Sequence, residues 1–156
     1  FQHTLIGDGE QRSEIEKWRR ELGLETETVM LGTRPHDDVC RSLRQADLFV
    51  LGCEQAPNGD RDGIPNVILE SMAMGVPVVA TRFSAIPEVI DSECNGLLVK
   101  PGQPAAMAAA MVTALEDADL RRDLITKGLE TVRRRFDNRI LVEDLASVFK
   151  HHTDLG

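Results

Sequence analysis

Two acidic residues, Asp62 and Glu70, stand at the entrance and in the second turn of one predicted helix. Pro65 can occupy the first helical turn, where its missing N–H costs nothing, and Gly75 can end the helix in a left-handed conformation. The first amides of a helix have no partner within it, so with the helix dipole they form a site for an anion such as a diphosphate. Glu70 is a lone carboxylate among apolar neighbours and needs a partner. This pattern predicts binding of a phosphorylated ligand beside a carboxylate.

Short strands and helices alternate on either side of this helix, and the chain ends in helices alone. The alternation predicts a parallel sheet with helices on both faces, an α/β fold of the doubly wound, Rossmann-like kind. Ligands of such folds sit at the carboxyl ends of the strands. Strands are predicted at 3–6, 28–31, 47–51, 78–80 and 97–99. Helices are predicted at 10–22, 37–45, about ten residues from Pro65, 87–91, 104–115, 118–135 and 138–151.

The segment from Asp62 to Thr81 resembles the donor-binding, C-terminal domain of retaining GT-B glycosyltransferases (glycosyl transferases group 1, family four). In that family an acid, seven residues and a glutamate precede a segment like Ala-Met-Ala-x-Gly-x-Pro-Val-Val-Ala, and Asp62 and Glu70 keep that spacing. The resemblance covers most of the chain. Its other parts are Leu5 to Glu10, Val29 to Gly32, Ala46 to Leu51, Ile86 to Ile90 and Asn95 to Val99.

The resemblance implies a role for each acid. Glu70 would accept hydrogen bonds from the ribose hydroxyls of the nucleotide, a charge-assisted contact. The alternative is that Glu70 is a buried carboxylate that accepts its hydrogen bonds from the neighbouring backbone. Asp62 matches the acid beside the donor sugar, the candidate catalytic residue, although the family more often has a glutamate there. Glu54 is a competing acid, but Asp62 is preferred because Gly63 follows it.

Two turns complete the implied donor site. In the first, backbone amides would face the diphosphate, although Gly-Ile-Pro replaces the commoner Gly-Phe-Gly and leaves fewer amides. The donor-binding residues implied in this turn are Gly63, Ile64, Asn66 and Val67. In the second, Thr33 and Arg34 match the family's base-binding turn, where backbone groups read the base edge. An ordinary strand-to-helix loop is the alternative for this pair.

Other glycine and acid positions fit structural roles better. Gly7-Asp8-Gly9 resembles part of a dinucleotide fingerprint, but Arg12 stands in place of its third glycine, so a dehydrogenase is disfavoured. Ser84-Ala85 stands where family members commonly carry two glycines, and Glu88 is expected to cap its helix.

Composition narrows the class of protein. A chain of 156 residues with 42% hydrophobic content predicts a single domain over 1–156. The net charge of -8 disfavours binding to nucleic acid. The arginines near the end of the chain alternate with acidic residues, which is typical of a solvent-exposed helix. No segment reads as secretory or membrane-spanning. Scattered cysteines and histidines predict reduced thiols and no metal site; they are Cys40, Cys53, Cys94, His3, His36, His151 and His152.

For the whole protein, the resemblance implies two Rossmann-like domains, of which this chain would be the donor half. It would lack the acceptor domain, the domain's first strand and the arginine and lysine that neutralise the diphosphate, so alone it should be inactive. The parent would transfer sugar from a UDP-, GDP- or ADP-sugar to a saccharide or lipid-linked acceptor, with retention and without cofactor or metal. The implied setting is cytoplasmic polysaccharide assembly, with peripheral membrane association through the missing half. The alternative is a non-catalytic nucleotide-binding regulatory or scaffold module.

Overall fold

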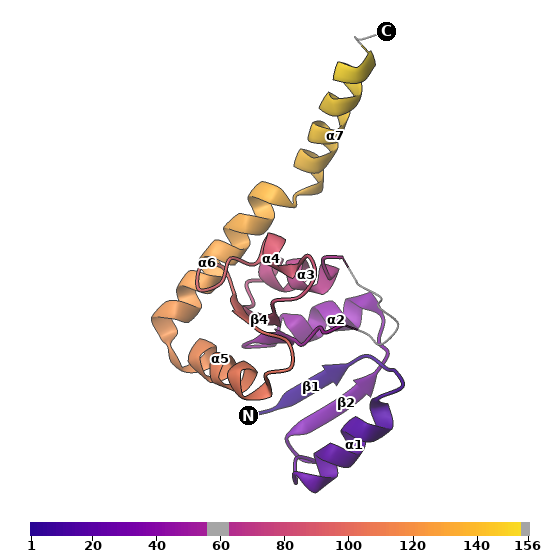
Figure 1. Ribbon diagram of the computed structural model, residues 1–156, viewed down its shortest axis with the longest axis vertical. Coiled ribbons are helices and arrows are strands. Elements are labelled where there is room, and N and C mark those ends of the chain that lie inside the picture. The colour runs from indigo at the N-terminus through magenta and orange to yellow at the C-terminus, as the bar shows by residue number, and fades with distance from the viewer. Residues whose placement is uncertain (56–62, 154–156) are drawn as a thin grey trace. The chain divides into compact units, whose positions relative to one another are not determined.

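The computed structural model describes residues 1–55 and 63–153 (Figure 1). The chain divides into two compact units, Phe1–Ser42 and Leu43–Gly156, and each is described by itself. The expectation of a single domain stays a prediction. Among the described residues, none of the helices combines the length and apolarity that crossing a membrane requires.

The first unit is built on two parallel strands. Strand β1 (His3–Ile6) pairs with β2 (Thr28–Gly32), with His3 opposite Thr28 and an irregularity between Leu5 and Ile6. Helix α1 (Arg12–Glu21) connects them, and α2 (His36–Leu43) follows β2. Gly23 adopts a φ of +65° after the end of α1, which turns the chain back toward β2.

The second unit holds a three-stranded parallel sheet in the order β3-β4-β5. Its strands are β3 (Phe49–Leu51), β4 (Val78–Thr81) and β5 (Leu97–Val99). Its helices are α3 (Asn66–Ala73), α4 (Ile86–Val89), α5 (Pro104–Glu116), α6 (Ala118–Arg135) and α7 (Asn138–Thr153). The predicted doubly wound, parallel α/β architecture is confirmed, with the strands grouped as two sheets.

Strand β4 shows why helices must cover both faces of this sheet. Val78, Val79 and Ala80 are all 0% exposed, so successive side chains bury against opposite layers. Val78 and Ala80 join a core cluster with Ile68 of α3 and with residues of α4. Val79 joins a second cluster, with Leu97 of β5, Ala114 of α5 and Leu124 of α6. The apolar run that predicted a buried strand therefore places β4 at the centre of the unit.

Helix α6 packs against α3. Gly128 of α6 is buried, and a Cβ atom there would lie 3.4 Å from the Cγ of Met72 in α3. The other side of α6 carries exposed ion pairs, such as Arg122 with Asp119 and Arg134 with Glu130. These pairs agree with the solvated-helix interpretation of the late arginines.

Candidate functional site

Helix α3 begins at the predicted place. Pro65 is its N-cap, with φ −64° and ψ 118°, and its carbonyl accepts a hydrogen bond from the Ile68 amide at 3.0 Å. Pro65 thus stands just before the first turn instead of within it, because its extended ψ belongs to a cap residue. The helix opens with Asn66 and Val67. Amides in the first turn of a helix have no hydrogen-bond partner within it. This end of α3 is therefore suited to an anionic group.

The far end of α3 is closed by the predicted glycine. Gly75 adopts a φ of +74°, and its amide donates to the Met72 carbonyl at 3.1 Å. The Val76 amide donates to the Ser71 carbonyl at 3.0 Å, and the chain turns from there into β4. A left-handed residue at this point explains why glycine follows the helix.

One face of α3 is anchored in the core and leaves Glu70 at its margin. Ile68, Ser71 and Met72 are at most 2% exposed, and the Ser71 hydroxyl donates to the Val67 carbonyl at 2.7 Å. Glu70 is half-buried, in the second turn, where the positive helix end still favours a carboxylate. A rigid helix thus fixes this side chain within a turn of the anion-binding amides.

The turn before α3 is partly anchored as well. Ile64 is half-buried and packs against the core cluster that contains Ile68, whereas Gly63 and Asn66 are exposed. The structure therefore brings four predicted donor-binding residues and Glu70 together at the start of one helix. Asp62, the predicted catalytic acid, lies outside the described residues.

The predicted base-binding turn belongs to the first unit. Gly32 ends β2 with a φ of +68°, and Thr33 and Arg34 follow it as exposed residues. Pro35 directly precedes α2, and its carbonyl accepts hydrogen bonds from the amides of Asp38 at 3.0 Å and of Val39 at 3.2 Å. The exposed turn leaves its backbone groups accessible at the carboxyl end of β2, where α/β folds bind ligands.

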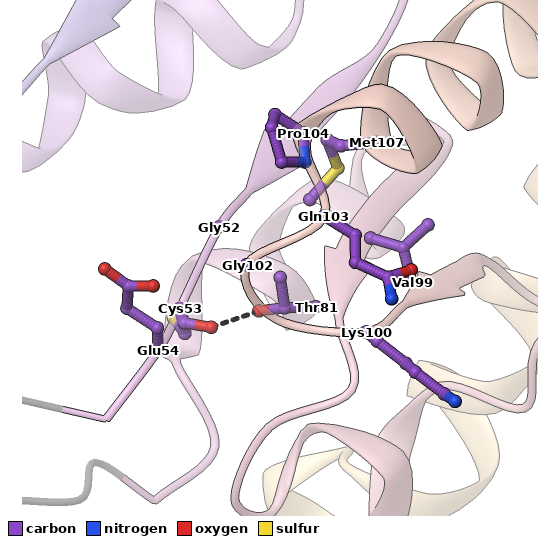
Figure 2. Close-up of a pocket in the computed structure, with 10 residues that line it drawn as sticks. All are labelled: Gly52, Cys53, Glu54, Thr81, Val99, Lys100, Gly102, Gln103, Pro104 and Met107. Carbon is purple, nitrogen blue, oxygen red and sulfur yellow. Dashed lines mark hydrogen bonds between the residues drawn. The ribbon is translucent and has the colours of Figure 1, made fainter.

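The structure also shows a cavity that the motifs did not indicate. It lies at the carboxyl ends of β3, β4 and β5 and has a volume of about 220 Å³ (Figure 2). The Thr81 hydroxyl donates to the Cys53 carbonyl at 2.5 Å across its floor. Glu54 and Lys100 also line it, but Figure 2 shows their side chains pointing to opposite sides. The rule that ligands sit at the carboxyl ends of strands indicates this place, and Glu54, the competing acid, lies there.

The loop after β4 has a glycine-like conformation without glycine. Ser84 adopts a φ of +48°, a left-handed value, in the position where the resembling family commonly has glycine. Ala85 follows as the N-cap of α4. The backbone geometry that favours glycine is thus kept in this chain although the residue type is not.

These features define a parallel α/β protein in which the first amides of helix α3 lie within a turn of a half-buried glutamate. The chain belongs to the glycosyl transferases group 1 family, whose family model matches residues 1–117.

Curated relatives agree with this assignment. The chain is 30% identical over 151 residues to an amylovoran biosynthesis glycosyltransferase of Erwinia amylovora, covering 96% of this chain and 37% of that protein. It is 30% identical over 145 residues to the N-acetyl-α-D-glucosaminyl L-malate synthase of Bacillus anthracis, covering 93% of this chain and 36% of the relative. The chain thus spans little more than a third of the length of these relatives.

Solved structures show the same fold. Anabaena HepE in complex with UDP-glucose aligns with a TM-score of 0.78 at 30% identity, over 94% of this chain and 41% of that one. The sucrose-phosphate synthase of Thermosynechococcus elongatus aligns with a TM-score of 0.81 at 24% identity, over 98% of this chain and 39% of that one. This second similarity is evidence of the fold alone.

Proposed function

We propose that this chain binds the nucleotide half of a nucleotide-diphosphate sugar, and that the protein containing it is a retaining hexosyltransferase. The observation that carries the proposal is the half-buried Glu70 in the second turn of α3, whose first amides suit a diphosphate. Family membership supports it, as does the similarity to HepE, which was solved with UDP-glucose. UDP is therefore the first nucleotide to test, with GDP and ADP beside it.

Each part of the proposed site has a distinct chemical task. The Glu70 carboxylate accepts hydrogen bonds from the ribose hydroxyls. The amides of the turn from Gly63 to Val67 face the diphosphate, and backbone groups of Thr33 and Arg34 read the base. Asp62 is the proposed acid beside the donor sugar. In the transfer, the anomeric carbon bonds to an acceptor hydroxyl oxygen, the electron pair of its broken bond leaves with the nucleoside diphosphate, and the hydroxyl proton passes to the departing phosphate oxygen.

The setting of the reaction is part of the proposal. The acceptor is a saccharide or a lipid-linked saccharide, held by a further domain of the same protein, which would also make any peripheral membrane contact. The names of relatives in polysaccharide biosynthesis support this setting. Neither a nucleic acid nor a cofactor is needed. A cytoplasmic location is proposed, and the thiols of Cys40 and Cys94, which are in no disulfide, support it.

The decisive experiment measures how Glu70 and the ribose act together. We would titrate the ¹⁵N-labelled chain, as wild type and as Glu70→Ala, with UDP and with 2′-deoxy-UDP. We expect Glu70→Ala to weaken UDP binding about 10- to 100-fold, since a hydrogen bond to a charged group contributes about 1.5–3 kcal/mol. The mutation should change 2′-deoxy-UDP binding much less, because one of the two hydroxyls is already absent.

A matched control separates this contact from general charge. Glu116, an exposed acid at the end of α5, gives the control Glu116→Ala, which should bind UDP as the wild type does. If Glu70→Ala lost equal affinity for UDP and for 2′-deoxy-UDP, that result would contradict the ribose contact. Absence of binding by UDP, GDP and ADP would contradict the donor site in this chain.

The same residue tests the alternative of a non-catalytic module. In the full-length protein, a transferase should release UDP from a UDP-sugar only with acceptor present, and Glu70→Ala should abolish that release. Nucleotide binding without any sugar transfer would favour a regulatory or scaffold role. The anomeric configuration of the product, read from its proton coupling constant, tests retention.

A further inference from the structure

Arg12 lies at the carboxyl end of the first unit's sheet, between two carboxylates. It is the first residue of α1, and its Nη1 lies 3.0 Å from the Oδ2 of Asp8. Its Nε lies 3.2 Å from the Oε1 of Glu16, one turn further along the helix. The side chain is 39% exposed, and these two partners hold its planar fork in one orientation.

This guanidinium lies beside the end of the neighbouring strand, in the space that a side chain at Gly32 would need. A Cβ atom at Gly32 would lie 3.3 Å from the Nη1 of Arg12 and 3.7 Å from the Oδ2 of Asp8. The Gly7 amide donates to the Gly32 carbonyl at 3.0 Å, so the loop after β1 is joined to the same residue. The Arg12–Asp8 pair therefore covers Gly32, whose left-handed φ leads directly into Thr33.

The local charge shows what kind of role Arg12 can have. One guanidinium set against the carboxylates of Asp8 and Glu16 leaves the group with a net negative charge. Such a group repels a phosphate, so Arg12 does not replace a cation that binds diphosphate. Its position over Gly32 indicates a mechanical role instead.

We propose that Arg12 is a positioning residue, which its pairs with Asp8 and Glu16 hold against Gly32 so that the turn from Gly32 to Arg34 keeps one backbone geometry. This inference rests on the proposed function, in which that turn reads the nucleobase. A turn with a fixed geometry discriminates between bases, because its donors and acceptors match one base edge. Without Arg12 the turn would have to be ordered by the ligand, at a cost in affinity.

The test compares Arg12→Ala and Arg12→Lys with Arg20→Ala, a control at an exposed arginine of the same helix. In the unliganded chain, ¹⁵N relaxation should show the order parameters of Thr33 and Arg34 fall in Arg12→Ala, from about 0.85 toward about 0.6. UDP binding should weaken about five- to tenfold, which is the scale of ordering a short turn. The ratio of ADP to UDP dissociation constants should move toward one.

The conservative variant and the α3 signals separate positioning from folding. Arg12→Lys keeps the charge but loses the planar fork that engages two carboxylates. Its order parameters and its UDP affinity should therefore lie between those of wild type and Arg12→Ala. The UDP-induced shifts of the Val67 amide should persist in all variants at saturating UDP. Arg20→Ala should match wild type in every readout.

The outcomes are decisive in either direction. The inference would be overturned if Arg12→Ala left the order parameter of Thr33 unchanged and kept the ratio of the ADP and UDP dissociation constants within twofold of the wild-type ratio. If Arg12→Ala loses the dispersed amide signals of residues 1–42, Asp8→Asn decides in its place, because it removes one partner and leaves Arg12. If wild type binds no nucleotide, the proposed function fails, and the order parameters of Thr33 and Arg34 still decide whether Arg12 positions the turn.

Discussion

Asn95 is a buried polar side chain whose removal should cost the second unit much of its stability. It is 5% exposed, and its Oδ1 accepts a hydrogen bond from the Asp91 amide at 2.8 Å. Its Nδ2 donates to the Val89 carbonyl and to the Thr131 hydroxyl, both at 2.9 Å. One amide therefore joins the end of α4 to α6.

In Asn95→Ala the Val89 carbonyl and the Asp91 amide both lose this partner. Each unsatisfied buried group costs about 1–3 kcal/mol. Asp91 is exposed, so water can reach its amide, and we expect a total loss of about 2–4 kcal/mol of unfolding free energy. That is a large part of the roughly 5–15 kcal/mol that stabilises a typical domain.

Urea unfolding followed by circular dichroism measures this loss. With a slope of about 2 kcal/mol per M, the midpoint should fall by about 1–2 M. Thr131→Ala is the matched comparison, because it removes one of the three hydrogen bonds and leaves both backbone groups paired with Asn95. It should cost about 1 kcal/mol. The reasoning is refuted if Asn95→Ala loses no more free energy than Thr131→Ala.

Two further predictions concern packing and pH. Gly96→Ala should destabilise the chain by about 1–3 kcal/mol in urea unfolding, because its Cβ would lie 2.9 Å from the Cγ2 of Ile90. Gly9→Ala, which would meet nothing within 4 Å, should cost less than about 1 kcal/mol. The hydrogen bonds from Arg139 lower the pKa of Asp137 from its ordinary value of 3.8 to about 2. The stabilisation that these hydrogen bonds give the folded chain is therefore fully present above pH 3.8 and is lost as the pH falls through 2. A carboxyl ¹³C titration should give a midpoint near 2 in wild type and a higher midpoint in Arg139→Ala, which loses the side-chain hydrogen bonds but keeps the backbone amide of residue 139 as a donor, and equal midpoints would contradict this pairing.

The sequence predicted most elements of the fold because local signals and packing agree. Helix α6 (Ala118–Arg135) and β5 (Leu97–Val99) have the bounds that were predicted. The side chain of Asp117 caps α6 by accepting a hydrogen bond from the Leu120 amide at 2.9 Å, a local signal that sequence carries. Strand β4 was predicted from an apolar run, which a strand buried on both faces requires.

Periodicity indicated which residues share a helix face, but not whether that face is buried. Ile15, Trp18 and Leu22 recur at helical spacing, which predicts that they share one face of the helix at 10–22. In the first unit Trp18 is 52% exposed, and Leu22 is 69% exposed just beyond the end of α1. Burial depends on what packs against the helix, and no local pattern specifies that neighbour.

The same distinction applies to the candidate site. The residues at the start of α3 could be predicted because they are contiguous and carry cap and helix-end signals. The strand-end rule indicates where the cavity at the ends of β3, β4 and β5 lies, but not which residues line it, because they come from loops far apart in sequence, such as those of Cys53 and Gly102. The position of Arg12 over Gly32 could not be predicted for the same reason, because the two residues are far apart in sequence.

The contact of Gly128 with Met72 affects how mutational scans of this protein should be interpreted. Gly128 belongs to α6, yet any side chain added there would meet the helix that carries Glu70. Substitutions at Gly128 can therefore reduce ligand binding by shifting α3, without any contact with the ligand. A scan that scores binding alone would place Gly128 among the ligand contacts, and a parallel scan of abundance would separate the two groups.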